Sequence, residues 1–309
     1  MHPFRFAVQT QNAPDLSAWR QRARDAEAMG FSALLVPDHF TEQWGPLVAL
    51  TAAAEATERL RVGALVFDND FRHPMELAKE VATLDALYDG RVEFGLGAGW
   101  MRTDYEQSGI PFEEPGVRVD RMAEAITVLK GLWSGEPVTF RGEHYTLTDA
   151  VGLPRPHTQP HPRICIGGGS KRVLSIAARE ANIVGFNASL RAGYVGPEVA
   201  ATAVPERFDD RVQWVRDAAG DRFDELELQC HTSFAMVVPN RQEIVDGMAG
   251  MFDVSPEVAL QIPIVLVGTV DEICETLQER RQRWGFSYWI INSDAMAAFA
   301  PVVERLAGT

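Results

Sequence analysis

Residues 61–100 of this 309-residue chain read RVGALVFDNDFRHPMELAKEVATLDALYDGRVEFGLGAGW. Two short apolar runs, at 60–67 and 91–97, flank an amphipathic stretch at 73–90 that has proline near its start and glycine at its end. Proline in the first turn and glycine after the last turn are typical of a helix, and continuous apolar runs are typical of parallel strands buried on both faces. The segment therefore predicts strand, helix and strand, which is one unit of a parallel α/β fold.

The same unit repeats along the rest of the chain. Predicted strands begin near residues 4, 33, 61 and 91, so the repeat is about 28–30 residues long. After a long interruption, strand-like runs return at 163–168, 182–187, 226–238 and 287–292. Four plus four strands with helices between them favour a closed (β/α)8 TIM barrel over an open doubly wound sheet.

Two stretches interrupt the repeat, one after the fourth predicted strand and one after the seventh. The first, at about 98–162, contains a helix, a hairpin-like segment and a proline-rich loop. The second, at about 239–286, contains two or three predicted helices. Because no low-complexity linker separates them from the repeat, we expect one barrel domain over 1–309 with both stretches as insertions near the ligand site.

The composition limits the classes of partner. Lys and Arg number 29 against 43 Asp and Glu, a net charge of −14, which argues against nucleic acid because phosphate backbones bind basic surfaces. The three cysteines lie far apart without the spacing of zinc ligands, as expected of reduced thiols in a cytoplasmic protein with no metal site. The N-terminus lacks the apolar core of a signal peptide, and no apolar run approaches about 18 residues, so no membrane association is expected.

Polar residues follow the second and third predicted strands, at the end of the barrel where active sites lie. Asp38 and His39 end the second strand in VPDHF and are candidates for an acid–base pair. The alternative is that Asp38 caps a turn while His39 packs nearby. Asn69 follows the third strand, and Arg72 and His73 come next, where they either contact a ligand or begin the next helix.

Glycines follow the fourth predicted strand. Gly95, Gly97 and Gly99 allow the backbone to approach a ligand closely. Their G-x-G-x-G spacing is not the dinucleotide fingerprint, so a Rossmann site is not predicted. The seventh predicted strand contains His231, which we expect to be a core histidine.

The fifth predicted strand runs into IGGGSKR at 166–172. Three consecutive glycines followed by Ser170 and a helix predict an anion cradle, in which backbone N–H groups and the positive end of the helix dipole face a phosphate. Lys171 or Arg172 could supply a local charge despite the acidic chain. A flexible loop is the alternative interpretation.

Together these motifs resemble the luciferase-like monooxygenase superfamily, and within it the oxidoreductases that use the deazaflavin coenzyme F420. The pairing of DHF after the second strand with FRHP and GLGAGW is the most specific part of the resemblance. The matching segments occur in the right order over nearly the whole chain: 61–100, RVDRMAEAITVLKGLW (118–133), GEHYTL (142–147) and PRICIGGGSKRVLSIAAREANIVG (162–185).

The resemblance implies a barrel that binds a flavin or deazaflavin at the strand C-termini, usually as a homodimer. It implies a non-prolyl cis peptide behind the ring, at Leu65–Val66 by position, and it assigns the ring contact to Asp38 and the acid–base role to His39. One departure is Trp100, which stands where deazaflavin-dependent sugar-phosphate dehydrogenases have a glutamate and so implies a larger, more apolar substrate. The predicted cofactor-binding residues are Asp38, Leu65, Val66, Asn69, Gly97, Gly99, Gly167, Gly168, Gly169, Ser170, Lys171 and Arg172.

The resulting hypothesis is a cytoplasmic oxidoreductase that moves a hydride between coenzyme F420 and a small-molecule or peptide substrate, as a reductase that consumes the reduced coenzyme. His39 is expected to donate or accept the proton, and Asp38 to position the ring or tune that histidine. Two alternatives stay open. One is an FMN-dependent monooxygenase that uses dioxygen, and the other is a catalytically silent barrel that only binds a flavin or deazaflavin.

Overall fold

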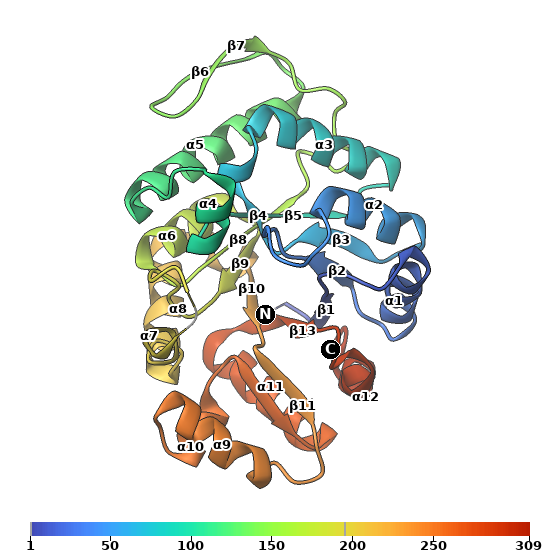
Figure 1. Ribbon diagram of the computed structural model, residues 1–309, viewed down its shortest axis with the longest axis vertical. Helices are drawn as coiled ribbons and strands as arrows, with labels where there is room; N and C mark the ends of the chain where they lie inside the picture. Colours follow the sequence, from blue (N-terminus) through green and yellow to red (C-terminus); the bar gives the residue numbers. More distant parts are fainter. Residues whose placement is uncertain (1, 195) are drawn as a thin grey trace.

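The computed structural model describes residues 2–194 and 196–309, and its centre is a closed barrel of parallel strands (Figure 1). Neighbouring barrel strands are all parallel, and β5 closes the ring by pairing with both β3 and β4. The predicted (β/α)8 TIM barrel with insertions after its fourth and seventh strands is therefore confirmed. The barrel strands are β1 (Arg5–Gln9), β2 (Ala33–Val36), β3 (Arg61–Ala64) with β4 (Phe67–Asp68), β5 (Val92–Gly97), β8 (Arg163–Gly168), β9 (Ile183–Phe186), β10 (Glu227–His231) and β13 (Phe286–Asn292).

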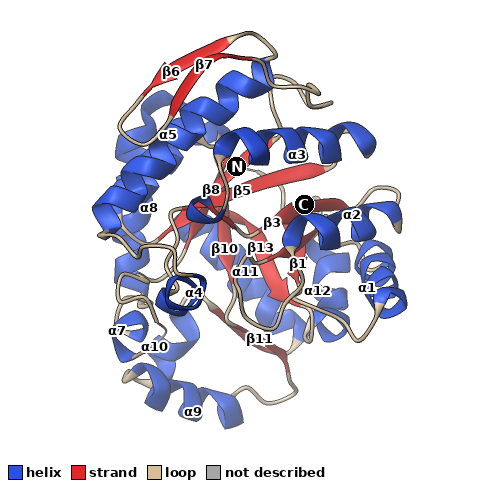
Figure 2. Cartoon of the chain, turned by 45° about the horizontal axis from the view of Figure 1, so that its top comes forward, coloured by secondary structure: helices blue, strands red, loops and turns tan. Residues whose placement is uncertain are grey.

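Helices enclose the strands, as Figure 2 shows in blue around red. Local sequence explains their boundaries. Asp15 caps the first helix by accepting a hydrogen bond from the backbone N–H of Ala18, and Thr269 and Glu272 form a reciprocal capping box at another. The enclosing helices are α1 (Leu16–Ala28), α2 (Pro46–Glu55), α3 (Pro74–Leu87), α5 (Pro115–Ser134), α6 (Lys171–Glu180), α8 (Pro205–Ala219), α11 (Val270–Trp284) and α12 (Met296–Leu306). In the described part of the chain, no helix combines the length and the apolarity needed to cross a membrane.

Further elements lie between the barrel units. The stretch after β5 contains a short helix near the barrel mouth and an antiparallel hairpin that lies beyond α5 (Figures 1 and 2). The bounds of these elements are η1 (Asn69–Phe71), α4 (Arg102–Ser108), β6 (Val138–Arg141), β7 (Thr146–Ala150), α7 (Pro197–Ala200), η2 (Gly220–Glu225), β11 (Phe234–Val237), α9 (Gln242–Phe252), α10 (Pro256–Gln261) and β12 (Val265–Gly268).

The predicted seventh strand, 226–238, is wrong in its extent. The structure divides it into β10, which belongs to the barrel, and β11, which pairs in parallel with β12 in a separate two-stranded sheet. The chain changes partner at Ser233, whose backbone N–H bonds to Ile264 instead of to β13. β12 was not predicted, because its four buried residues lie in a stretch whose other residues favour helix.

A buried ion-pair cluster fills the barrel interior near the N-terminal ends of the strands. Arg5 lies 2.5 Å from Glu93 and 2.5 Å from Glu227, and the hydroxyl of Tyr288 donates to Glu93 at 2.9 Å. Burial opposes ionisation of Glu93, but Arg5 and Arg61 hold the pKa of its carboxyl below the ordinary value. Because this end is filled by paired charges, the open volume of the barrel lies at the other end.

Candidate active site

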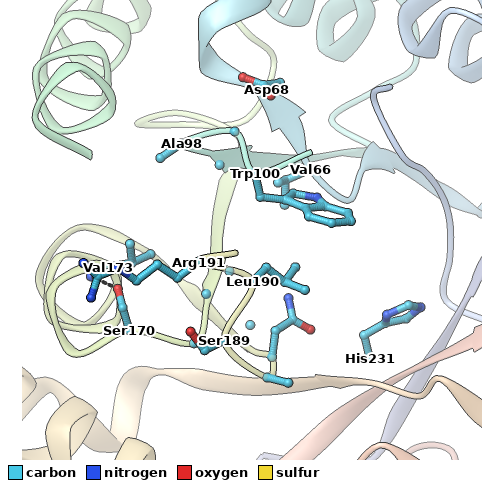
Figure 3. Close-up of a pocket in the computed structure, with 18 of the residues that line it drawn as sticks. Val66, Asp68, Ala98, Trp100, Ser170, Val173, Ser189, Leu190, Arg191 and His231 are labelled. Carbon is cyan, nitrogen blue, oxygen red and sulfur yellow. Dashed lines mark hydrogen bonds between the residues drawn. The ribbon is translucent and has the colours of Figure 1, made fainter. Parts of the chain in front are cut away.

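A cavity of about 670 Å³ opens at the C-terminal ends of the barrel strands (Figure 3). A cavity of this size at this end of a (β/α)8 barrel is the expected place for a cofactor and a substrate. Most of the residues predicted from sequence line it together, although they lie at or just beyond the ends of four different barrel strands. These are Asp38, His39, Leu65, Val66, Gly97, Gly99, Gly167, Gly168, Gly169, Ser170 and Arg172.

Two predicted cofactor residues do not line this cavity. Asn69 is 3% exposed, and its amide donates to the hydroxyl of Tyr145 at 3.2 Å, because the 3-10 turn that follows β4 directs it toward the hairpin. Lys171 begins α6 as an exposed residue, and Arg172 is the one that lines the cavity. The structure also contains the cis peptide at Leu65–Val66 that the resemblance implied, between β3 and β4.

The carboxylate that contacts His39 is Asp104, on the inserted helix α4. Nδ1 of His39 lies 2.7 Å from Oδ2 of Asp104, and the other oxygen of Asp104 accepts the backbone N–H of Phe40 at 3.0 Å. The Asp104 side chain is 1% exposed. Since a carboxylate can only accept here, it holds the proton on Nδ1 and leaves Nε2 for a ligand, as in other His–carboxylate pairs. Trp100 packs edge-on against this histidine, with ring centroids 5.6 Å apart.

Asp38 is bonded elsewhere. Its carboxylate forms a two-point pair with the guanidinium of Arg72 and also accepts the backbone N–H of Asp68 at 3.1 Å. Burial opposes the charge of Arg72, but the bond to Asp38 keeps the pKa of Arg72 above its ordinary value. The sequence left open whether Arg72 and His73 contact a ligand or begin the next helix. In the structure Arg72 holds Asp38 in place, and His73 caps α3. Asp38 thus presents a fixed, paired carboxylate to the cavity.

Asp68 is a cavity residue that the sequence interpretation missed. It is 6% exposed and accepts the backbone N–H of Asp70 at 2.9 Å and the hydroxyl of Tyr105 at 3.3 Å. Burial, together with the nearby carboxylates of Asp70 and Asp38, raises the pKa of Asp68 to about 7. Its position directly after the predicted strand was the available signal, but Asn69 was the residue of the motif DND that was predicted to bind the cofactor.

The glycine cradle lies at the start of α6. Ser170 caps this helix by accepting the backbone N–H of Val173 on its hydroxyl. Two of the glycines are required by packing: a Cβ at Gly168 would lie 2.6 Å from the side chain of Val173, and one at Gly169 would lie 2.6 Å from the carbonyl oxygen of Ala188. The first-turn N–H groups and the helix dipole are suited to an anion.

Two buried arginines without a carboxylate partner flank the cradle. Arg118 of α5 lines the cavity, is 4% exposed, and donates to the carbonyl oxygens of Ala98 and Gly99 at 3.3 and 3.4 Å. Arg211 of α8 is 3% exposed and donates to the carbonyl oxygen of Gly169 at 3.1 Å, directly behind the cradle. Within the described ranges neither forms an ion pair, and burial lowers the pKa of Arg211 to about 10.

These two charges are suited to an anionic ligand because both lie beside the glycine cradle. Among the described residues Arg280 is likewise buried with only carbonyl partners, but it neither lines the cavity nor bonds to the cradle. Fully buried charges are normally paired, because removing a charge from water is costly. Carbonyl oxygens satisfy the N–H groups of Arg118 and Arg211 but do not neutralise them. Sequence reasoning missed both, because each lies on a helix that is far along the chain from the glycine cradle.

His231 is not the core histidine expected from sequence. It lines the cavity at the end of β10, and its Nε2 is a buried atom with no hydrogen-bond partner in the described structure. Burial lowers the pKa of His231, and a hydrogen bond to the side chain of Asn292 opposes this only in part. The imidazole is therefore neutral near pH 7.

Sequence comparison finds relatives that use two different cofactors. An FMNH2-dependent dimethylsulfone monooxygenase of Pseudomonas putida is 30% identical over 178 residues, which cover 56% of this chain and 49% of that protein. An F420-dependent glucose-6-phosphate dehydrogenase of Microbacterium testaceum is 36% identical over 163 residues, which cover 50% of this chain and 47% of that protein. The matches to these curated relatives thus span about half of their length.

Comparison with solved structures shows the same fold over the whole chain. A coenzyme F420-dependent tetrahydromethanopterin reductase of Methanopyrus kandleri superposes with a TM-score of 0.79 at 18% identity, covering 98% of this chain and 99% of that one. An F420-dependent secondary alcohol dehydrogenase, solved with an F420–acetone adduct, has a TM-score of 0.74 at 21% identity and covers 99% of both chains. The family model of the luciferase-like monooxygenases matches residues 1–221, which is more than half of the sequence. The chain belongs to the luciferase-like monooxygenase family.

Proposed function

We propose that this protein is an oxidoreductase that binds the deazaflavin coenzyme F420 and transfers a hydride between that coenzyme and an organic substrate, acting as a reductase. One observation supports this above the others: a single cavity joins the His39–Asp104 pair to an anion cradle flanked by buried arginines. When bound, the deazaflavin supplies the hydride chemistry, and the protein supplies orientation and proton transfer.

The cradle would hold the phosphate of the coenzyme. The N–H groups at the start of α6 would donate to the phosphate oxygens, and Arg118 and Arg211 would supply positive charge nearby. A phosphate at this position would provide both arginines with a counter-ion. This local arrangement explains how a chain of net charge −14 can bind an anion without a basic surface.

His39 would exchange the proton that accompanies hydride transfer. Asp104 fixes the proton on Nδ1, so Nε2 is free to accept a proton or, once protonated, to donate one. The buried carboxylate also fixes the orientation of the ring, since it lies 2.7 Å from Nδ1. Asp38, fixed by Arg72, would position the ring beside Leu65 and Val66.

The arginines around the cradle favour the deazaflavin over FMN. FMN ends at its phosphate, whereas the deazaflavin coenzyme continues beyond the phosphate into further carboxylates. Arg172 and Arg191 are exposed residues that line the cavity, and Figure 3 shows Arg191 on the side where Ser170 lies. Arg191 can pair with those carboxylates at a place where FMN has no group to contact it, and Arg172 can do so by exchanging its ion pair with Asp120.

A fluorescence titration of the cofactor-free chain tests the proposal. Oxidised coenzyme F420 and FMN are each titrated, alongside their phosphate-free forms, a deazaflavin nucleoside and riboflavin. We expect the coenzyme to bind at least tenfold more tightly than FMN, and each phosphate-free form to bind at least tenfold more weakly than its parent. Tight FMN binding without deazaflavin binding would instead support an FMN-dependent monooxygenase, as in the relative from Pseudomonas putida.

A second measurement separates an enzyme from a silent binding barrel. His39→Ala leaves the cradle intact, so coenzyme binding is expected to stay within a few-fold of the parent chain. The rate of coenzyme oxidation or reduction with an accepted substrate is expected to fall by a factor of roughly 100 or more, the usual contribution of a general acid–base group. An unchanged rate would contradict the assignment of His39.

A further inference from the structure

Positive charge is distributed unevenly around the cavity. The arginines that line it all come from elements that follow β5, β8 and β9, which are neighbours in the barrel: Arg118, Arg172 and Arg191. Arg172 forms an exposed ion pair with Asp120, so the uneven distribution rests on Arg118 and Arg191. The opposite arc of the barrel consists of β10, β13, β1 and β2. Among the described lining residues, none on that arc is a lysine or an arginine. We call this arc, represented by Gln9, His39, Gln229, His231 and Ser233, the neutral end of the cavity.

The titratable groups at the neutral end carry no free positive charge. His231 is uncharged near neutral pH, because burial lowers its pKa. His39 is paired with the buried carboxylate of Asp104, so any charge it gains is already compensated. Asp38 is paired with Arg72, which itself does not line the cavity. A ligand at this end therefore meets neutral hydrogen-bonding groups and compensated charges.

Apolar side chains separate the neutral end from the cradle. Figure 3 shows the indole of Trp100 and the side chain of Leu190 in the middle of the cavity, with Ser170 and Arg191 on one side and His231 on the other. The remaining polar groups at the neutral end are amides and a hydroxyl, which donate or accept hydrogen bonds without charge. Such a lining favours a ligand whose surface is mostly apolar and carries a few oxygen atoms.

We propose that the neutral end takes the substrate, and that this substrate is an uncharged, largely apolar organic molecule with a hydrogen-bonding oxygen, not a phosphate ester or a carboxylate. The inference rests on the proposed function, since it assigns the cradle end to the coenzyme. An anionic substrate at the neutral end would lose its hydration without gaining a counter-ion, which is unfavourable in a buried site.

The test is a calorimetric comparison of ligands that differ in one anionic group. Acetophenone and para-acetylbenzoate are titrated into the coenzyme-loaded chain, and glucose 6-phosphate serves as a sugar-phosphate probe. We expect acetophenone to bind at least tenfold more tightly than its carboxylate, and glucose 6-phosphate to show no saturable binding. Equal or tighter binding of para-acetylbenzoate, or saturable binding of glucose 6-phosphate, would overturn the proposal.

Two lysine variants test at which end of the cavity the substrate binds. Ser233→Lys places a cation at the neutral end, so it is expected to raise the affinity of para-acetylbenzoate relative to that of acetophenone at least tenfold. Ser189→Lys is the matched control, because Ser189 also lines the cavity but follows β9, on the arc that already has arginines. It is expected to leave the preference unchanged. If Ser189→Lys rescues the carboxylate and Ser233→Lys does not, the substrate does not lie at the neutral end and the proposal fails.

The proposed function can fail separately. Coenzyme binding is measured first, without substrate, by the fluorescence titration described above. If no flavin or deazaflavin binds, the proposed function is refuted, and the same ligand titrations on the cofactor-free chain still decide the charge preference of the neutral end. If the coenzyme binds normally and the carboxylate is preferred, only the substrate class is wrong.

Discussion

Asp104→Asn removes the charge beside His39 while changing little else. The asparagine can keep its carbonyl oxygen on the backbone N–H of Phe40, where Oδ1 of Asp104 now accepts at 3.0 Å. The amide nitrogen then replaces the oxygen that lies 2.7 Å from Nδ1 of His39. Because an amide N–H donates, Nδ1 must become an acceptor and the ring proton must move to Nε2. The variant therefore presents the other tautomer to the ligand.

The size of the effect follows from the contact that is lost. A short, buried hydrogen bond to a carboxylate contributes about 1.5–3 kcal/mol, and each 1.36 kcal/mol corresponds to a factor of ten in rate. If the full contribution is felt in the proton-transfer step, Asp104→Asn slows that step by about 10- to 150-fold. Coenzyme affinity is expected to change less than threefold, since Asp104 is not among the cavity-lining residues.

The assay is a stopped-flow measurement of single-turnover oxidation of the reduced coenzyme by a substrate that the parent chain accepts. Asp85→Asn is the matched control, because Asp85 is also a fully buried carboxylate but accepts hydrogen bonds from Val92 and Thr158 away from the cavity. It should reduce stability without the rate effect. If Asp104→Asn turns over at the parent rate with unchanged affinity, the His39–Asp104 pair is not the proton-transfer group and the reasoning fails.

Arg211→Met should weaken binding of the phosphate-bearing coenzyme at least tenfold and leave its phosphate-free nucleoside within threefold, measured by fluorescence titration; equal losses for both would contradict the role given to Arg211. Glu93→Gln should lower the free energy of unfolding by about 3 kcal/mol in urea denaturation, because it leaves buried positive charge near Arg5 uncompensated. Since the folded-state pKa of Glu93 is lowered, its contribution is present above the unfolded pKa and is lost as pH falls through the folded value, so the difference should shrink below about pH 4. Asp68 behaves in the opposite way: its pKa is raised to about 7, so Asp68→Asn should stabilise the fold at pH 8, by at most about 4 kcal/mol, and by less at pH 5, where Asp68 is protonated. Thermal melts at both pH values check this, and a larger gain at pH 5 would contradict the raised pKa.

The parts of the site that were predictable from sequence are those that one short segment builds alone. Gly167–Ser170 runs from a buried strand into a helix, so the cradle follows from adjacent residues and their packing. Asp38 and His39 were found because a barrel brings all strand ends to one mouth. The β–α repeat and the count of four plus four strands predicted the barrel, which the closed ring of parallel strands confirms.

The parts that were missed depend on contacts between distant segments. Asp104 is 65 residues from His39 and reaches it from the insertion after β5. Arg118 and Arg211 look like ordinary charged helix residues in the sequence, and only their burial shows that each lacks a counter-ion. The strand β12 was missed because its pairing with β11 takes place outside the barrel repeat. Contacts between residues so far apart in the sequence leave no local sequence pattern from which they could be predicted.

The buried arginines also show where selectivity for an anion can reside in an acidic protein. A cradle of backbone N–H groups binds phosphate, but it has no side chain through which binding strength could be adjusted. In the proposed function Arg118 and Arg211 would provide that adjustment, because their charge acts through a buried medium where Coulomb interactions are stronger than in water. The free-energy cost of burying these two charges is present in the free protein, and a bound anion would reduce it. On the proposed assignment, the same buried medium would penalise a second anion at the neutral end, where none of the described lining residues is a lysine or an arginine. One cavity would then accept a phosphate at one end and reject it at the other.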